Sequence, residues 1–364
     1  MKKKIAIILG TRPEIIKLSP IIRECQKRHL DFFILHTNQH YSENLDNIFF
    51  KNLKLPKPKY NLKVGSGTHA EITAKMLVGI ERILKKEAPM VVLIQGDTNT
   101  VLAGALAAVK LNIKIGHIEA GLRSYFKLMP EETNRIITDH CSDFLFTPTR
   151  LSKDILLKEG INSKNIFVVG NTVVDALFQN LKLFKNSTIL NILNIKPKSY
   201  FLATIHRQEN VDDKKRLQAI IDGLEIVSSK FNKNIILPIH PRTKNNISKF
   251  KIKIPKGIKI IEPIGYLDFI NLEFHASLIF TDSGGIQEEA CILKVPCVTL
   301  RDNTERPETV MVGANVLVGV SSQKIIIGTQ KMLKKKNNWH NPFGNGLSSK
   351  KILDIILKNI KDKK

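Results

Sequence analysis

The chain has 364 residues, of which 43% are hydrophobic and 25% charged, and its 57 Lys and Arg residues outnumber its 33 Asp and Glu residues, giving a net charge of +24. This length exceeds what one hydrophobic core comfortably supports and favours two domains. No apolar run approaches the roughly 20 residues that a membrane-spanning helix needs, so the sequence excludes an integral helical membrane protein. The lysines are spread along the predicted helices rather than interleaved with aromatic residues, which indicates a solvated surface and not a nucleic-acid interface.

The four cysteines, Cys25, Cys141, Cys291 and Cys297, show no CxxC spacing and lie within predicted helices or strands. We interpret them as reduced core residues. The opening MKKKIAIILG runs directly into a predicted strand and turn, which is not the pattern of a signal peptide. Together these features predict a cytoplasmic protein.

In chain order, apolar runs predict strands that alternate with helices through the first half of the sequence. The strands are expected at 4–9, 31–37, 90–97, 113–120, 143–148 and 166–171, and clear helical patterns cover 69–86 and 99–111. Strands rich in apolar residues and separated by helical crossovers are typical of a parallel, doubly wound sheet.

The same alternation restarts after a helix expected at 175–184 and a polar stretch. Strands are expected at 200–206, 234–240, 258–263, 277–283, 295–300 and 315–319. The fold class predicted is therefore α/β, with two Rossmann-like doubly wound domains at residues 1–172 and 173–347. A last helix within 348–364 can pack back on the first domain.

The stretch GTRPEIIKLSP, residues 10–20, follows the first predicted strand and opens a helix. Thr11 and Glu14 have capping-box spacing, and Pro13 suits a first helical turn. Arg12 and Lys17 are unexpected there, because a helix N-terminus already carries partial positive charge. Two cations at this position make sense if a dianionic ligand binds between them and the helix; a solvated helix face is the alternative.

A second anion site is suggested by Ser283, Gly284 and Gly285, which follow a predicted strand and open a helix. Glycines let backbone N–H groups approach an anion closely, and the helix dipole favours negative charge. A plain tight turn would have a similar sequence.

Three carboxylates, Asp97, Glu119 and Glu131, lie just past predicted strand ends or at a helix start in the first domain. Ligands bind beyond the carboxyl ends of strands in such sheets, so these groups could perform general acid/base catalysis. They could also cap helices, as Asp97 before Thr-Asn-Thr would, or bind a metal. We expect no metal, because the sequence has neither HExxH nor clustered Cys/His spacing.

His206 and His240 each end a predicted strand and are followed closely by an arginine, a repetition that favours a ligand role. The stretch Gly65-Ser66-Gly67-Thr68-His69-Ala70 resembles a dinucleotide motif. It lacks a preceding core strand and a later acidic residue, so we expect no nicotinamide cofactor.

Over nearly its whole length the chain resembles the non-hydrolysing UDP-N-acetylglucosamine 2-epimerases. The resemblance rests on GTRPEIIKLSP, TNQH, QGDT, HIEAGLR, PEETNR, TIHRQEN, TDSGGIQEEA and TERPE. It implies a GT-B-like pair of domains with the active site in the interdomain cleft, a homodimer, and no metal or cofactor. It also implies that UDP-N-acetylglucosamine and UDP are the ligands, and that the enzyme inverts C2 of the sugar by elimination and re-addition of UDP.

The resemblance also assigns residues. Asp97, Glu119, Glu131 and His206 match the catalytic positions, and Asp97, Glu119 and His206 also match substrate contacts. The UDP-binding positions are Arg12, Lys17, Ser283, Gly284, Gly285, Glu289 and Arg306, with Phe269 near the uracil. Gln39, His40, Arg207 and His240 match a second, activating substrate site of bacterial members.

This sequence departs from the family in three places. The stretch between Arg123 and Pro130 is shorter than usual, and Gln208 stands where a second arginine is common. Val64-Gly65-Ser66 replaces a Gln-bearing loop that contributes to the second site, which leaves activation by substrate open.

Three other functions share these features. A hydrolysing 2-epimerase would release N-acetylmannosamine and UDP, and a GT-B-type glycosyltransferase would need an acceptor. A binding protein could use the phosphate turns alone but would not need three carboxylates beside them.

Overall fold

The computed structural model describes residues 4–38 and 49–360, which form two compact units. The first contains the described residues up to Gln179 and from Phe343 onward, and the second is Asn180–Pro342. We expected divisions after residues 172 and 347; the observed ones differ because the start of α7 (Thr172–Lys185) is buried in the first unit.

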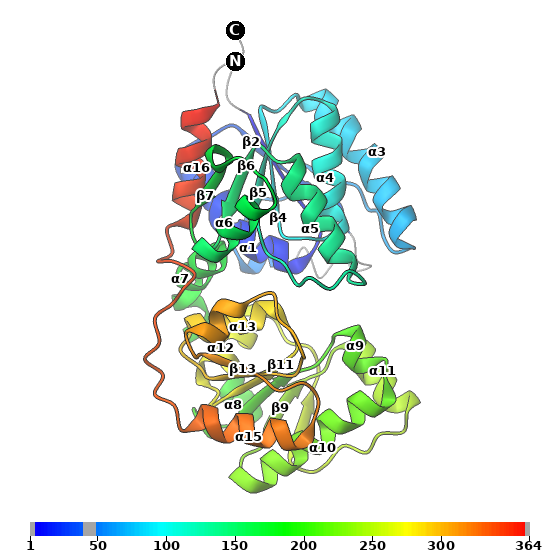
Figure 1. The fold of residues 1–364 in the computed structure, drawn as a ribbon, viewed down its shortest axis with the longest axis vertical. Helices are drawn as coiled ribbons and strands as arrows, with labels where there is room; N and C mark the ends of the chain where they lie inside the picture. Colours follow the sequence, from blue (N-terminus) through cyan, green and yellow to red (C-terminus); the bar gives the residue numbers. More distant parts are fainter. Residues whose placement is uncertain (1–3, 39–48, 361–364) are drawn as a thin grey trace. The chain divides into compact units, whose positions relative to one another are not determined.

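A parallel sheet with the strand order β3-β2-β1-β4-β5-β6-β7 forms the centre of the first unit (Figure 1). Its strands are β1 (Ile5–Leu9), β2 (Phe32–His36), β3 (Tyr60–Asn61), β4 (Val91–Gln95), β5 (Lys114–Ile118), β6 (Phe144–Thr147) and β7 (Ile166–Val168). In addition to the start of α7, this unit contains the helices α1 (Arg12–Lys27), α3 (His69–Glu87), α4 (Asn99–Lys110), α5 (Pro130–Cys141), α6 (Arg150–Lys158) and α16 (Ser348–Asn359), and the 3₁₀ turn η1 (Ser163–Asn165).

The second unit contains a parallel sheet with the order β10-β9-β8-β11-β12-β13. Its strands are β8 (Phe201–Thr204), β9 (Ile235–Pro238), β10 (Ile258–Ile261), β11 (Ile279–Thr281), β12 (Cys297–Thr299) and β13 (Asn315–Leu317). Its helices are α8 (Ile189–Leu193), α9 (Gln208–Val211), α10 (Lys214–Phe231), α11 (Pro241–Lys249), α12 (Tyr266–His275), α13 (Gly284–Ile292), α14 (Pro307–Met311) and α15 (Ser322–Leu333).

Both faces of the second sheet are covered by helices, as the continuous apolar strands predict. Phe201 and Ala203 of β8 belong to an apolar cluster that includes Leu217 of α10. Leu202, between them, belongs to a different cluster with Leu272 of α12. Successive residues of one strand therefore pack into cores on opposite faces, which is the two-residue period of a strand.

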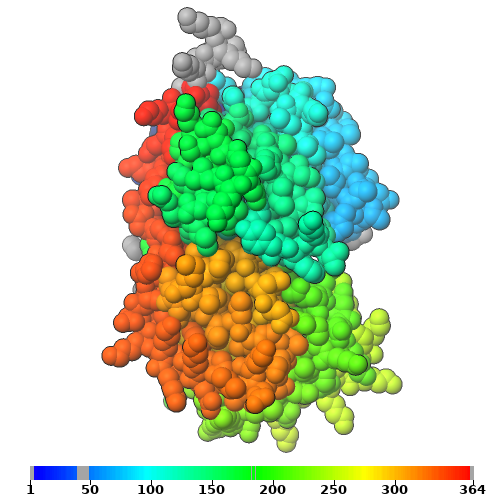
Figure 2. All heavy atoms as spheres, in the orientation of Figure 1, coloured from blue at the N-terminus to red at the C-terminus, as the bar shows by residue number. Residues whose placement is uncertain are grey.

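The predicted fold class is confirmed, and the expected strands match β1, β2 and β4–β13. The two-residue β3 was not predicted, because it contains no apolar run. In the view of Figures 1 and 2, α16 (red) and α3 (blue) lie on opposite sides of the first unit. At the end of α1, Arg28 Nη1 lies 2.6 Å from Asp354 Oδ1 of α16. None of the helices described is both long and apolar enough to cross a membrane.

Candidate active site

The adjacent strands β1, β4 and β5 end together at one edge of the first sheet, and the predicted site residues of this unit follow them. Gly10 follows β1 at a position where a side chain would collide with its neighbours. A Cβ on Gly10 would lie 2.2 Å from the hydroxyl oxygens of both Thr37 and Thr100. The glycine therefore allows the backbone before α1 to lie close to Thr37, which follows β2, and to Thr100 in the first turn of α4.

Glu14 connects two of these loops. Its carboxylate accepts hydrogen bonds from the N–H groups of Gly10 at 2.5 Å and Thr11 at 2.9 Å, which forms the glutamate half of the predicted capping box. The hydroxyl of Thr98, in the loop after β4, donates to the other oxygen at 2.5 Å. Burial raises the pKa of Glu14 to about 7, although these hydrogen bonds oppose the shift.

The two cations of the opening motif have different surroundings. The Arg12 guanidinium lies over the Phe49 ring, 5.4 Å from its centroid. Lys17 is buried, and its Nζ lies 2.5 Å from Oε1 of Glu119. The structure thus pairs a residue predicted to bind UDP with a residue predicted to be catalytic.

Glu119 is held by three donors. Besides Lys17, the side-chain amide of Gln95 donates to Oε2 at 2.5 Å and that of Asn171 to Oε1 at 2.7 Å. Its backbone has a φ of 69°, in the left-handed region that a residue other than glycine adopts rarely. Such conformations persist where the surroundings determine them, and they cluster at functional sites. Donors of this kind orient the side chain and favour its carboxylate form.

Asp97 follows β4, and its Oδ2 is paired with the guanidinium of Arg135. Arg135 Nη1 also lies 2.5 Å from Glu132 Oε2, so one arginine bridges two carboxylates. Thr98, and not Asp97, is the N-cap of α4, which contradicts the capping interpretation of Asp97.

Glu131 and Glu132 occupy neighbouring positions at the start of α5 but differ in environment. Glu132 is buried and accepts from the N–H groups of Ser124 and Tyr125, both at 2.9 Å. Glu131 is half-buried, and its side chain makes no hydrogen bond or ion pair with the described part of the chain. Glu132 therefore fixes the short loop before α5, and Glu131 does not.

In the second unit, Asp282 organises the loop that carries His206. Its carboxylate accepts from the N–H groups of His206 and Arg207, at 3.0 Å each, and lies 2.9 Å from His206 Nδ1. Burial would raise the pKa of Asp282, but the charge of His206 and these hydrogen bonds lower it below its ordinary value. An ionised partner on Nδ1 fixes the ring and leaves Nε2 for a ligand.

The other predicted UDP-binding residues also belong to this unit. Ser283 is the N-cap of α13, so Gly284 and Gly285 form its first turn, and Glu289 lies further along the same helix. Arg306 Nε lies 2.5 Å from Oε1 of the buried Glu288, also on α13. Phe269, on α12, is half-buried against an apolar cluster.

Two residues of the predicted second substrate site lie near His206. The His206 and His240 ring centroids are 5.9 Å apart, and Arg207 Nη2 lies 3.8 Å from Glu305 Oε1. His240 also has a structural role as N-cap of α11, because its Nδ1 accepts from the Arg242 N–H at 3.2 Å. Gln39 and His40 lie outside the described residues.

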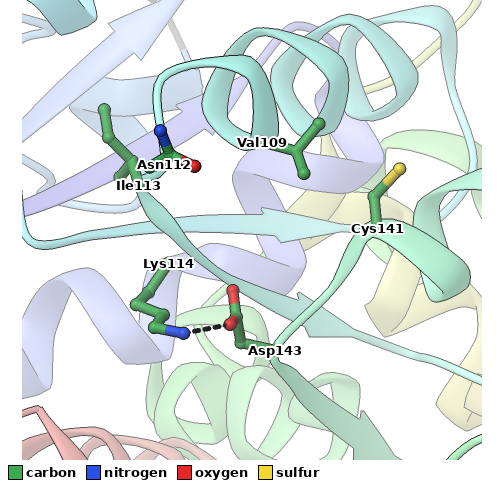
Figure 3. Close-up of a pocket in the computed structure, with 6 residues that line it drawn as sticks. All are labelled: Val109, Asn112, Ile113, Lys114, Cys141 and Asp143. Carbon is green, nitrogen blue, oxygen red and sulfur yellow. Dashed lines mark hydrogen bonds and ion pairs between the residues drawn. The ribbon is translucent and has the colours of Figure 1, made fainter.

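A pocket in the first unit lies at the wrong end of the sheet for this site. Figure 3 shows its lining, Val109, Asn112, Ile113, Lys114, Cys141 and Asp143. Lys114 is the first residue of β5 and Asp143 precedes β6, and their side chains form an ion pair of 2.5 Å. Ligands of such sheets bind at the opposite, carboxyl ends of the strands.

Sequence reasoning missed four residues that hold the predicted ones in place: Gln95, Arg135, Asn171 and Asp282. Their contacts join residues that are far apart in the sequence, as between His206 and Asp282, which are 76 residues apart. The available signal was position, since Gln95 ends a strand and Asp282 follows one. Within the described residues, no group of three His, Cys, Asp or Glu side chains could hold a metal ion.

Known proteins resemble this chain across nearly all of its length. The family model for UDP-N-acetylglucosamine 2-epimerase matches residues 23–357. The UDP-N-acetylglucosamine 2-epimerase of Methanocaldococcus jannaschii is 60% identical over 360 residues, covering 97% of this chain and 98% of the relative.

Solved structures show the same likeness. The M. jannaschii UDP-GlcNAc 2-epimerase in complex with UDP-GlcNAc and UDP has a TM-score of 0.93 at 59% identity, covering 98% of this chain and 100% of that one. The Neisseria meningitidis UDP-GlcNAc 2-epimerase bound to UDP-GlcNAc has a TM-score of 0.90 at 36% identity, with the same coverage. The chain therefore belongs to the UDP-N-acetylglucosamine 2-epimerase family.

Proposed function

We propose that this protein is an isomerase that interconverts UDP-N-acetylglucosamine and UDP-N-acetylmannosamine by inverting C2, without releasing free sugar. The observation that carries the proposal is the buried Glu119 carboxylate, held by Lys17, Gln95 and Asn171 where β4 and β5 end. The family and the UDP-GlcNAc bound to two relatives support the substrate.

The chemistry of C2 favours an elimination route. The C2 hydrogen is not next to a carbonyl, so removing it to form an enolate is unavailable. If the C1–O bond to UDP breaks while a carboxylate takes the C2 proton, the products are a glycal-like intermediate and UDP. Return of the UDP oxygen to C1, with a proton delivered to the opposite face of C2, gives the epimer and restores every atom.

We assign the proton transfers to Asp97, Glu119 and Glu131, all of the first unit. Asp97 follows β4, Glu119 follows β5, and Glu131 lies in the first turn of α5. Glu119 is already oriented by donors, and Asp97 is paired with Arg135. Two different groups are required, because the proton leaves one face of C2 and arrives on the other. General acid/base catalysis of this kind contributes typically about 10²- to 10⁴-fold in rate.

We assign stabilisation of the departing UDP to cations and helix N-termini. Arg12 and Lys17 lie in the first turns of α1, and Ser283, Gly284 and Gly285 open α13. A lysine ammonium has three donors, so Lys17 can keep its contact with Glu119 and also bind a phosphate oxygen. Donors placed where charge develops are commonly the largest catalytic contribution.

In this proposal His206, which Asp282 orients, also stabilises UDP. Arg306 and Glu289 complete the nucleotide site, and Phe269 lies near the uracil. The reaction as written needs no metal or nicotinamide. We further propose that the protein acts in the cytoplasm as a homodimer.

One incubation tests the function. The protein is mixed with UDP-N-acetylglucosamine alone, and the products are separated and identified by NMR. We expect UDP-N-acetylmannosamine and no free sugar. Free N-acetylmannosamine with UDP would show a hydrolysing enzyme, and unchanged substrate would favour a transferase or a binding protein.

A further inference from the structure

Asn171 joins Glu119 to the segments through which the chain leaves and re-enters the first unit. Its side chain is fully buried, and Nδ2 donates to Glu119 Oε1 at 2.7 Å. Its Oδ1 accepts from the Val173 N–H at 3.0 Å, at the start of α7, which leads out of the unit. Its backbone N–H donates at 2.8 Å to the carbonyl of Phe343, where the chain returns.

The contacts around Asn171 leave little freedom between the leaving and returning segments. A Cβ on Gly170, whose φ is +94°, would lie 2.9 Å from the Phe343 carbonyl oxygen and 2.7 Å from Ser348 Oγ. One turn along α7, Asp175 accepts from the N–H groups of Ser348 at 3.2 Å and Ser349 at 2.8 Å. The position of the Asn171 amide is therefore set by both segments together.

Lys17 and Asn171 share Oε1 of Glu119, while Gln95 binds Oε2. The Lys17 ammonium supplies charge but can rotate its three donors. The buried Asn171 amide, in contrast, is anchored through its side-chain oxygen and its backbone N–H. Asn171 also bonds to the start of α7 and to the returning segment.

We propose that Asn171 is a positioning residue for the reaction: it fixes the direction of the Glu119 carboxylate and ties it to the two segments that connect the units. This inference rests on the proposed function, in which Glu119 reacts at C2. Asn171 itself need not touch the substrate.

The test compares Asn171→Asp and Asn171→Ser with the unsubstituted chain. Aspartate keeps the shape of the side chain and the oxygen that caps α7, but replaces the donor with a second carboxyl group. At neutral pH we expect kcat to fall about 10- to 100-fold, as for loss of a hydrogen bond to a charged group, with little change in KM. At lower pH two close carboxyl groups share a proton, which restores a donor, so the activity of Asn171→Asp relative to the unsubstituted chain should rise towards pH 5.

Serine can also cap α7 but cannot span the distance to Glu119, so Asn171→Ser should lose kcat without regaining it in acid. This variant keeps the test decisive if Asn171→Asp does not fold. The matched control is Asp175→Asn, which weakens the contact between the same two segments without touching Glu119. It should lower Tm but leave the shape of the pH profile unchanged.

A second readout separates this inference from the proposed function. The titration of Glu119 is followed by carbon-13 NMR of glutamate-labelled protein, with Glu119→Gln to assign the signal. Asn171→Asp should move that titration to higher pH, and Asp175→Asn should not. If the unsubstituted chain fails to interconvert the two UDP-sugars, the proposed function is wrong. The NMR comparison alone then decides whether Asn171 positions the Glu119 carboxylate. Parallel pH profiles for Asn171→Asp and the unsubstituted chain, or an unmoved Glu119 titration, would overturn the inference.

Discussion

The two units share one architecture but use the carboxylates at their strand ends differently. After β5 of the first unit, Glu119 accepts from the side chains of Lys17, Gln95 and Asn171. After β11 of the second, Asp282 accepts from backbone N–H groups of the next loop and pairs with His206. The first carboxylate is held by side chains, and we propose that it reacts with the substrate; the second holds the next loop and the ring of His206.

This difference shows that the fold fixes only where polar groups gather. In the first unit the edge is rich in acids that cations partly neutralise, which suits proton transfer. In the second unit a helix opens with Ser283-Gly284-Gly285 beside a histidine, which suits an anion. The two edges therefore differ because of the residues in their loops and not because of the sheets.

The largest expected effect comes from Glu119→Gln in the first unit. Glutamine keeps the shape but cannot accept the C2 proton, so kcat should fall about 10²- to 10⁴-fold. UDP affinity, measured by calorimetry, should change little. Glu159→Gln is the control, since Glu159 pairs with Arg123 and has no assigned role. Turnover by Glu119→Gln at the rate of the control would remove Glu119 from the mechanism.

In the second unit, Asp282→Asn should reduce kcat about 10- to 100-fold, because His206 loses an ionised hydrogen-bond partner. Asp302→Asn, at an exposed pair with Arg216, is the control for removing a carboxylate from this unit. A kcat of Asp282→Asn equal to that of this control would show that Asp282 is only structural.

Arg12→Ala should weaken UDP binding about 10-fold, because a charge-assisted contact to a phosphate is among the stronger hydrogen bonds. The readout is the calorimetric Kd at fixed ionic strength. Arg150→Ala removes an exposed arginine from α6 of the same unit and should leave Kd unchanged. Equal affinities for the two variants would contradict the placement of UDP beside α1.

The last expected effect is on stability and not on activity: it is the pH dependence of unfolding due to Glu14. Its folded pKa of about 7 exceeds the ordinary 4.5, so the folded protein binds more protons between these values and its stability falls as pH rises through them. The shift corresponds to at most about 3 kcal/mol, or a few degrees in Tm. The Tm of the unsubstituted chain minus the Tm of Glu14→Gln should fall as the pH rises from 4.5 to 7, and it should then stay constant. A constant difference throughout would show that the pKa of Glu14 is not raised.

Sequence patterns predicted the strands well because both sheets are buried on both faces, so each strand is an apolar run. They also located Asp97, Glu119 and His206, since polar residues directly after such runs are recognisable. They also named Glu131, but not its neighbour Glu132, which the structure shows holding the loop before α5 through contacts with Ser124 and Tyr125.

The supporting residues were harder to predict. Asn171 and Glu119 are 52 residues apart in the chain, and nothing local to either residue indicates the contact. Arg135 on α5 was similarly unremarkable until the fold placed it beside Asp97 and Glu132. Such partners depend on which strands become neighbours, so they follow from the tertiary structure and not from the motifs.

The central claim is that C2 is inverted through loss and return of a proton, and the reaction in deuterium oxide tests it most directly. UDP-N-acetylglucosamine is incubated with the protein in deuterium oxide, and the UDP-N-acetylmannosamine formed is analysed by NMR and mass spectrometry. Elimination with two different acid/base groups predicts one deuterium at C2 of the product. Epimerised product that retains hydrogen at C2 would contradict the account.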